Sequence, residues 1–287
     1  MSILDSFAKK QVTVGFASPL SLRGMDGFSL TQPVKLIFNL TAPYDGPLVD
    51  LTNCRFFNLE MLEIQNIGAP AACGILLARS SPTSSCSNLT LKHVKVTGKY
   101  SVASLLLIGS EMVVVQNSYF QNNVPGSSAI RIVASNRNPE NVALPLVVSP
   151  FGPVAEGSDG SMASVSQSVV RFEACGATVD AGGGSNTVRI GQGTASITWV
   201  GGSLSANVAG SKSAFKIGEP GGTKCQFISI MGRPQIESPA DNGVRRLENG
   251  ILIDNVVEGF QTELGITSAN TAIKQRVPEL IKFNLLS

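Results

Sequence analysis

Apolar residues recur along the chain in a four-position pattern whose members are spaced two, three and two residues apart. The clearest set is Leu89, Leu91, Val94 and Val96. The two-residue steps indicate strands in which alternate side chains share a face, and the three-residue step indicates a corner between two short strands. Other complete or partial sets are Val113, Val115, Ser118 and Phe120; Ile197, Trp199, Gly202 and Leu204; Leu59, Met61 and Ile64; Val170, Phe172 and Cys175; and Ile251, Ile253 and Val256.

The intervals between these sets match one turn of a stacked β structure. From 59 to 89 is 30 residues, from 89 to 113 is 24, from 170 to 197 is 27, and from 197 to 251 is 54, or two turns. A unit of this kind cannot bury its apolar face alone, so it must stack on copies of itself. Each turn also carries a second apolar strand, predicted at 75–77, 105–108, 130–132, 188–190 and 215–217.

Turn residues punctuate the chain in the way that such a stack requires. Gly109, Gly191 and Gly218 directly follow three of the second strands and predict turns with positive φ. The pattern extends over 34–261, which predicts one all-β solenoid domain with short caps at 1–33 and 262–287. The 57 residues from 113 to 170 exceed one turn, and prolines within them predict an insertion at about 136–167.

Composition narrows the classes of partner. The 22 basic and 20 acidic residues give a net charge of +2 without a basic run, which argues against nucleic-acid binding. Charged residues make up only 15% of the chain. Two explanations stay open: other subunits cover part of the surface, or uncharged Ser, Thr and Asn cover the turns.

The remaining composition signals predict a soluble protein without a metal site. The start, MSILDSFAKKQ, has no apolar run of signal-peptide length, and the longest apolar stretch, 102–115, falls short of a membrane span. The five cysteines show no paired metal spacing and are expected to be reduced and buried, and we expect no cofactor. Phosphate-loop chemistry is excluded because the glycine clusters lack a following Gly-Lys-Ser or Gly-Lys-Thr.

The short strands, the turns of about 25 residues and the Asn-rich corners resemble the right-handed parallel β-helix of the pectate-lyase superfold, as used in bacteriophage tailspikes. The segments 88–98 and 113–117 carry this resemblance, which covers most of the chain. Asn66, Asn88, Asn117 and Asn255 are placed at corners, where Asn tolerates the left-handed conformation. The resemblance implies a right-handed parallel β-helix, but its members include lyases, glycoside hydrolases, adhesins and structural parts of virions, so the residues must decide the function.

Few residues are candidates for catalysis. A glycosidase on this fold would need two carboxylates facing one groove, and the candidate pairs are Glu173 with Asp180 and Asp254 with Glu258. A lyase would favour clustered acids, and Glu60 with Glu63 is the nearest approach to a cluster. His93 is the only histidine and is expected at an exposed corner, where it would have no chemical role.

These residues favour a non-enzymatic structural protein on the surface of a bacteriophage virion, either a capsid decoration protein or a short spike. The resemblance implies a homotrimer that is made in the host cytoplasm and contacts other virion structural proteins. Host surface polysaccharide is a further candidate partner. The alternative is a tailspike-type protein that binds or depolymerises host polysaccharide, as a glycoside hydrolase or polysaccharide lyase. The anchoring residues are predicted to be Leu4, Phe7, Val12, Val14 and Phe16, which would either contact the virion or cap the first turn.

Overall fold

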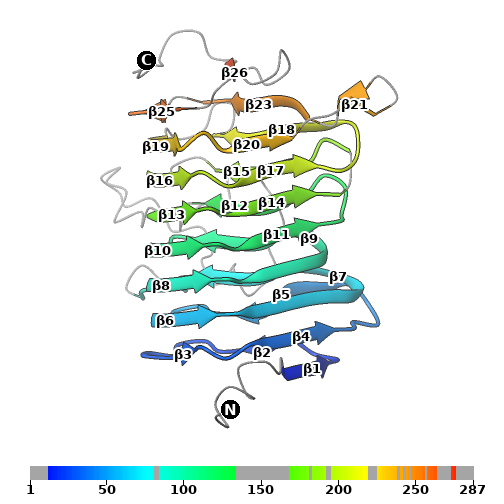
Figure 1. The fold of residues 1–287 in the computed structure, drawn as a ribbon. Coiled ribbons are helices and arrows are strands. Elements are labelled where there is room, and N and C mark those ends of the chain that lie inside the picture. Colours follow the sequence, from blue (N-terminus) through cyan, green and yellow to red (C-terminus); the bar gives the residue numbers. More distant parts are fainter. Residues whose placement is uncertain are drawn as a thin grey trace, which may run out of the picture.

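The computed structural model of this chain consists of β-strands stacked one above the other (Figure 1). It describes residues 12–80, 84–133, 168–180, 183–191, 195–218, 225–237, 240–241, 244–245, 247–255, 257–263 and 273–275. Within these ranges there is no helix, and the strands form two parallel sheets and one short antiparallel pair. The predicted all-β class is therefore confirmed, while the expected insertion at 136–167 lies outside the described residues.

The smaller sheet collects one strand, or in one case two, from each successive pass of the chain. Its strands pair in parallel, with residues of one pass directly above those of the last; for example, Leu89 lies opposite Val113, and Val113 opposite Val170. The first two-residue step of the sequence pattern falls in these strands. They are β3 (Ser29–Leu30), β6 (Arg55–Glu60), β8 (Ser87–Lys92), β10 (Glu111–Gln116), β13 (Val170–Glu173), β16 (Ala195–Val200), β19 (Cys225–Met231), β24 (Val257–Glu258) and β25 (Gln261–Thr262).

The larger sheet contains two stacks of strands that two long, bent strands join. The first half of β7 (Leu62–Ala78) pairs with β4, and its second half pairs with β5. The first part of β9 (Lys95–Ile108) pairs with β11, and its second part pairs with β12. One stack contains β1 (Val12–Phe16), β4 (Val34–Phe38), β11 (Tyr119–Asn122), β14 (Gly176–Val179), β17 (Ser203–Ala206) and β20 (Gln235–Glu237). The other contains β2 (Leu20–Ser21), β5 (Tyr44–Asp50), β12 (Ser128–Val133), β15 (Asn186–Ile190), β18 (Ser211–Ile217), β23 (Leu247–Ile253) and β26 (Ile273–Gln275).

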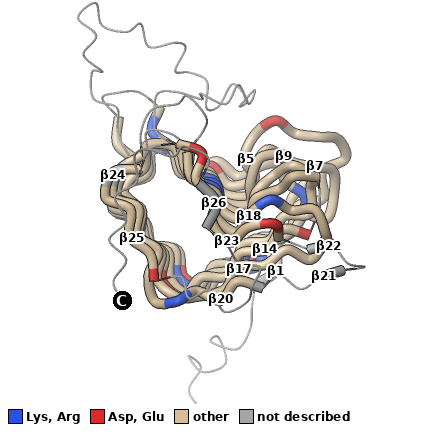
Figure 2. The backbone as a smooth tube through the Cα atoms, turned by 90° about the horizontal axis from the view of Figure 1, so that it is seen from above, with Lys and Arg blue, Asp and Glu red and all other residues tan. Residues whose placement is uncertain are grey.

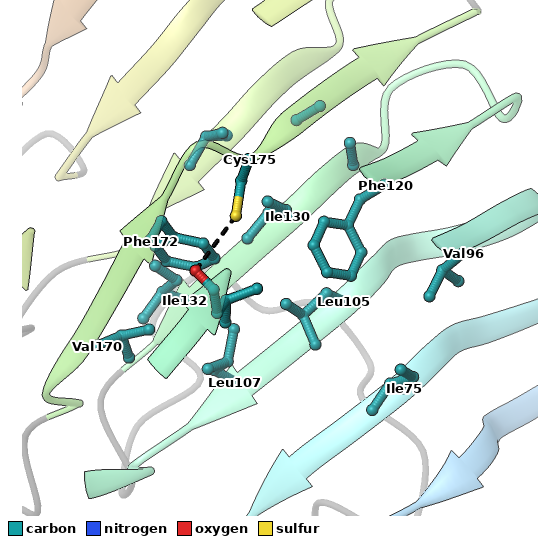
Figure 3. Packing of buried hydrophobic residues seen from close by; sticks show 14 of the residues in the cluster. Ile75, Val96, Leu105, Leu107, Phe120, Ile130, Ile132, Val170, Phe172 and Cys175 are labelled. Carbon is teal, nitrogen blue, oxygen red and sulfur yellow. Dashed lines mark hydrogen bonds between the residues drawn. The ribbon is translucent and has the colours of Figure 1, made fainter. Parts of the chain in front are cut away.

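The sheets nearly close around one apolar interior. Seen along the stack, successive passes overlie one another around this interior (Figure 2). Side chains such as Leu105, Phe120, Ile130 and Phe172 point into it and toward one another (Figure 3). The antiparallel pair, β21 (Ala240–Asp241) with β22 (Val244–Arg245), stands apart from both sheets. Burial of this continuous apolar column is the main stabilising contribution, because no single pass has a core of its own.

Two buried asparagines, Asn66 and Asn122, stabilise turns of the backbone. Asn122 is fully buried and donates to the carbonyls of Tyr100 and Ser128, both at 2.9 Å. Its carbonyl oxygen accepts from the amides of Tyr100 and Val124 at 3.0 and 3.2 Å. Asn66 contacts the backbone in the same way, whereas Asn122 was not predicted. Of the four asparagines expected at left-handed corners, Asn88 and Asn117 have positive φ, but Asn66 and Asn255 are not among the positive-φ residues.

In six passes, a left-handed residue turns the chain from the smaller sheet into the larger one. The same position, directly after the smaller-sheet strand, has φ between 47° and 69° in six passes. The amide of each of the first five donates to a carbonyl in the next pass, as His93 does to Gln116 at 3.0 Å. These residues are Met61, His93, Asn117, Ala174, Gly201 and Gly232, and we call them the corner column.

The apolar pattern predicts the wrong register at one place and the wrong sheet at another. Met61 is 38% exposed in the corner column, and the buried set of that pass is Phe57, Leu59, Leu62 and Ile64. The set that begins at Ile251 belongs to β23, which pairs with β18 of the larger sheet. The smaller-sheet set that precedes it is Ile228 and Ile230 in β19, opposite Ile197 and Trp199.

The stack extends beyond the predicted limits of 34 and 261. β1, β2 and β3 pair in parallel with β4, β5 and β6, so the first pass begins within the predicted cap at 1–33. At the other end, β26 pairs with β23. Two of the three predicted turn glycines, Gly109 and Gly218, have positive φ, but Gly191 is not among the positive-φ residues.

Candidate functional site

Glu173 ends β13 on the outer face of the smaller sheet. Its carboxylate accepts a hydrogen bond from the Gln116 amide at 2.6 Å and another from Arg171 Nε. The hydrogen bond from Arg171, followed by that from Gln116, lowers the pKa of Glu173 below its ordinary value. A carboxylate with a lowered pKa remains ionised at neutral pH, so Glu173 is a poor general acid.

Asp180 follows β14 and accepts hydrogen bonds from the side-chain amides of Gln121 and Asn207. Burial raises its pKa, and the hydrogen bond from Asn207 opposes this effect. Glu173 lies before β14 and Asp180 after it, and a strand of four residues spans about 10 Å between its first and last Cα atoms. This arrangement does not bring the two carboxylates to opposite sides of one bond, as a glycosidase requires.

The second candidate pair is divided between the two sheets. Asp254 follows β23 and is only 3% exposed; its Oδ2 lies 3.7 Å from Lys216 Nζ. Glu258 belongs to β24 of the smaller sheet, where its backbone pairs with Gln226, and its side chain lies outside the described residues. Asp254 is therefore part of a buried ion pair and does not face an open groove.

The remaining candidate residues form ion pairs, are exposed or are buried in the core. Glu60 pairs with Lys92 at 2.8 Å, and Glu63 pairs with Lys35 at 2.9 Å and Lys95 at 3.6 Å. His93 is exposed in the corner column, as predicted. All five cysteines are free and buried, which confirms the expectation for them. Within the described ranges, no group of three His, Cys, Asp or Glu side chains could hold a metal ion.

The outer face of the smaller sheet carries a shallow hollow of about 510 Å³ across β8, β10, β13 and β16. Sequence reasoning missed it. Its position at the beginning of these strands depends on the backbone conformation, which the pattern of apolar residues does not reveal. Its lining combines amide and hydroxyl groups, apolar side chains and one guanidinium: Asn88, Thr90, Met112, Val114, Val169, Arg171, Ser196 and Thr198.

Apolar side chains in the described part of the first pass are only partly buried. Val14 and Phe16 in β1 lie opposite Leu36 and Phe38, which belong to the buried core, and the Phe16 ring stacks on Phe38 with centroids 5.2 Å apart. Val14 is nevertheless 38% exposed. Five further apolar residues of the first pass are only partly buried: Leu20, Leu22, Met25, Phe28 and Leu30. Of the other predicted anchoring residues, Leu4, Phe7 and the side chain of Val12 lie outside the description.

Comparison of the chain with protein-family models, curated proteins and solved structures found no match. In the described part of the chain, no helix has the length and apolar character needed to cross a bilayer. Function must therefore be argued from the surfaces of the stack itself.

Proposed function

We propose that the chain is a right-handed parallel β-helix that serves as a non-enzymatic structural protein on the surface of a bacteriophage virion, as a decoration protein or short spike. It assembles as a homotrimer, and its N-terminal end anchors it to other virion structural proteins. The observation that carries this proposal is the incomplete burial of inward-facing apolar side chains in the described part of the first pass, because such side chains favour a covering partner.

The surroundings of the candidate acids support a role without catalysis. Glu173 is held in an ion pair with Arg171, and Asp254 is buried beside Lys216. Strand β14 separates Glu173 from Asp180, and Asp254 and Glu258 belong to segments of different sheets, which does not favour the two facing carboxylates that glycoside hydrolysis needs. Ion pairs that follow the stack from pass to pass, such as Lys35 with Glu63, are typical of a charge arrangement that maintains register.

The anchoring role is tested with two exposed valines. Val14 is 38% exposed at the N-terminal end, and Val208, after β17, is 40% exposed. Particles of the encoding phage, assembled without this chain, should bind the purified wild-type chain and V208E, but V14E should bind at least tenfold more weakly. Equal binding by the two variants would contradict the anchoring role.

Assembly and catalysis have separate tests. Light scattering on the purified chain should give the mass of a trimer, and a monomer at all concentrations would contradict the oligomeric state. Incubation with host envelope polysaccharide should release no new reducing ends. Release that is lost in E173Q or D254N would replace this proposal with the depolymerase alternative.

Polysaccharide binding without cleavage is a second candidate function. The hollow on the smaller sheet favours it, since an open depression lined by hydroxyl, amide and apolar groups suits a sugar polymer. Binding at this face is compatible with anchoring through the N-terminal end, because the two surfaces are formed by different parts of the stack.

A further inference from the structure

One residue near the beginning of each smaller-sheet strand forms a row up the outer face of the stack. Strand pairing places these residues at one register position; Phe56, for example, lies between partners at 55 and 57 that are opposite Ser87 and Leu89. All but one of them have positive φ, between 50° and 75°. The members are Gly27, Phe56, Asn88, Met112, Val169, Ser196, Phe227 and Gly259, and we call them the left-handed row.

The large residues of this row are unfavourable for the backbone that they occupy. A left-handed conformation brings Cβ close to the following carbonyl, so glycine is the favoured residue and asparagine is tolerated. Glycine occupies both ends of the row, at Gly27 and Gly259, where the same φ recurs. Phe56, Met112 and Phe227 therefore maintain a strained conformation that the fold can satisfy with glycine.

Burial does not compensate for this strain. Phe56, Met112 and Phe227 are 62%, 62% and 63% exposed, so they contribute little to the apolar interior. Backbone strain retained at exposed side chains points to a role outside the fold. These three residues are among the most exposed large apolar side chains in the described part of the chain.

The hollow lies between the two phenylalanines of the row. Met112, Val169 and Asn88 belong both to the row and to its lining, with Thr90 and Thr198 one step along the strands. Five strand spacings separate Phe56 from Phe227, a length of about 24 Å. Arg171 is the one ionisable residue among the lining side chains. Its contact with Glu173 engages Nε, which leaves the two terminal nitrogens to a ligand.

We propose that the left-handed row and the hollow bind a linear polysaccharide that carries carboxylate groups. Phe56, Met112 and Phe227 pack against the apolar C–H faces of successive sugars, and Asn88, Thr90 and Thr198 exchange hydrogen bonds with sugar hydroxyls. Arg171 pairs with a ligand carboxylate through its terminal nitrogens. The open, elongated shape suits a polymer that continues beyond the site at both ends. This inference rests on the proposed exposure of the protein at a virion surface, and it names the chemistry of the contact with the host.

The test replaces side chains of the row with the residue that the backbone favours. The F56G/F227G double variant should bind alginate and hyaluronan at least tenfold more weakly than the wild type in titration calorimetry. Its thermal unfolding midpoint should be unchanged or higher, because left-handed glycine removes the strain. The matched control is M61G: Met61 has φ of 55° and is 38% exposed, but it lies in the corner column at the opposite end of β6.

A second experiment tests whether the carboxylates of the ligand contribute to binding. R171Q should weaken alginate binding several-fold, and the propylene glycol ester of alginate, which has the same backbone with its carboxylates blocked, should bind the wild type as weakly as alginate binds R171Q. If the wild type binds neither alginate nor hyaluronan, the proposal is overturned. It is also overturned if M61G weakens binding as much as F56G/F227G does, or if F56G/F227G binds normally but loses the trimer, which would identify the row as a contact between copies. The V14E anchoring result is independent of all these outcomes.

Discussion

Replacement of Trp199 tests most directly whether the interior is packed as a continuous column. Trp199 is the only tryptophan and is 1% exposed in β16. Its ring stacks on Phe172 of the previous pass, with centroids 4.9 Å apart, and meets Phe215 edge-on at 5.4 Å. The indole Nε1 donates to the carbonyl of Gly201 at 2.7 Å. Three strands therefore lose contacts when this side chain is removed.

The structure sets the size of the effect. W199A removes a fully buried aromatic side chain and should lower the free energy of unfolding by about 3 to 5 kcal/mol. W199F retains a ring against Phe172 and loses chiefly the indole hydrogen bond and some volume, so it should cost about 1 to 2 kcal/mol. The exposed aromatic Phe227 is the control, and F227A should change stability by less than about 0.5 kcal/mol.

Urea unfolding followed by far-ultraviolet circular dichroism measures all three variants on one scale. The wild-type Trp199 fluorescence gives a second probe, located at the centre of the affected passes. A loss below about 1 kcal/mol for W199A would refute the close packing inferred here, because a collapsible or solvated interior would be needed to absorb the change. Equal losses for W199F and W199A would assign the effect to the hydrogen bond rather than to packing.

Three further predictions concern backbone, polar and thiol groups of the stack. G202A should lower the free energy of unfolding by about 3 kcal/mol or more, because φ is +76° and the new Cβ would lie 2.0 Å from the carbonyl oxygen of Cys175. G201A, whose Cβ would have no atom nearer than 3.8 Å, should lower it by about 1 kcal/mol in the same urea titration. N122A should lower stability by about 3 kcal/mol, measured by thermal unfolding, because four backbone groups lose their partner. Burial raises the pKa of Cys86 to about 12 and that of Cys175 to about 11, so the folded state keeps both thiols neutral while unfolded thiols ionise near 9. The contribution of these two thiols to stability should therefore be constant below pH 8 and fall as the pH rises from 9 toward 11, and an aromatic disulfide reagent should react with the native protein at pH 8 far more slowly than with the unfolded chain.

The spacing of apolar residues predicted the strands well where only inward positions are apolar. Leu89, Leu91, Val94 and Val96 are all buried, because the positions between them are polar and only one register fits. Around Met61, apolar residues occupy 57, 59, 61, 62 and 64, so two registers fit the sequence, and the predicted set with Met61 facing inward is wrong. The backbone decides between them, since of these five residues only Met61 has the left-handed conformation.

The misassigned Ile251 set shows a second limit of the pattern. Ile251 and Ile253 alternate exactly as an inward pair of either sheet would, and two turns of 27 residues reach 251 from 197 by coincidence. The pass between them is longer, since Ile228 follows its partner Ile197 by 31 residues. Variable connections between strands make such intervals a guide to the number of passes but not to which sheet a strand joins.

The residues that lie close together on the surface of the stack could be predicted only in part from the sequence. The candidate acids are close to one another along the chain, but β14 separates Glu173 from Asp180, and Asp254 and Glu258 belong to segments of different sheets. The left-handed row had a usable signal in Gly27, Asn88 and Gly259, which stand at one position relative to the strands. Only the pairing register of every smaller-sheet strand reveals the row, because its members are residues of successive passes that lie opposite one another.

The two left-handed columns of the stack allow a comparison within one molecule. Both have similar φ, so the backbone places the same demand on each side chain. The corner column meets this demand with His93, Asn117, Ala174 and two glycines, and Met61 is its one large apolar member. The left-handed row instead has two phenylalanines and a methionine in this conformation, and a hollow lies beside them. Left-handed geometry alone therefore does not account for exposed aromatic residues, and the difference between the columns must arise from what the outer face of the smaller sheet contacts.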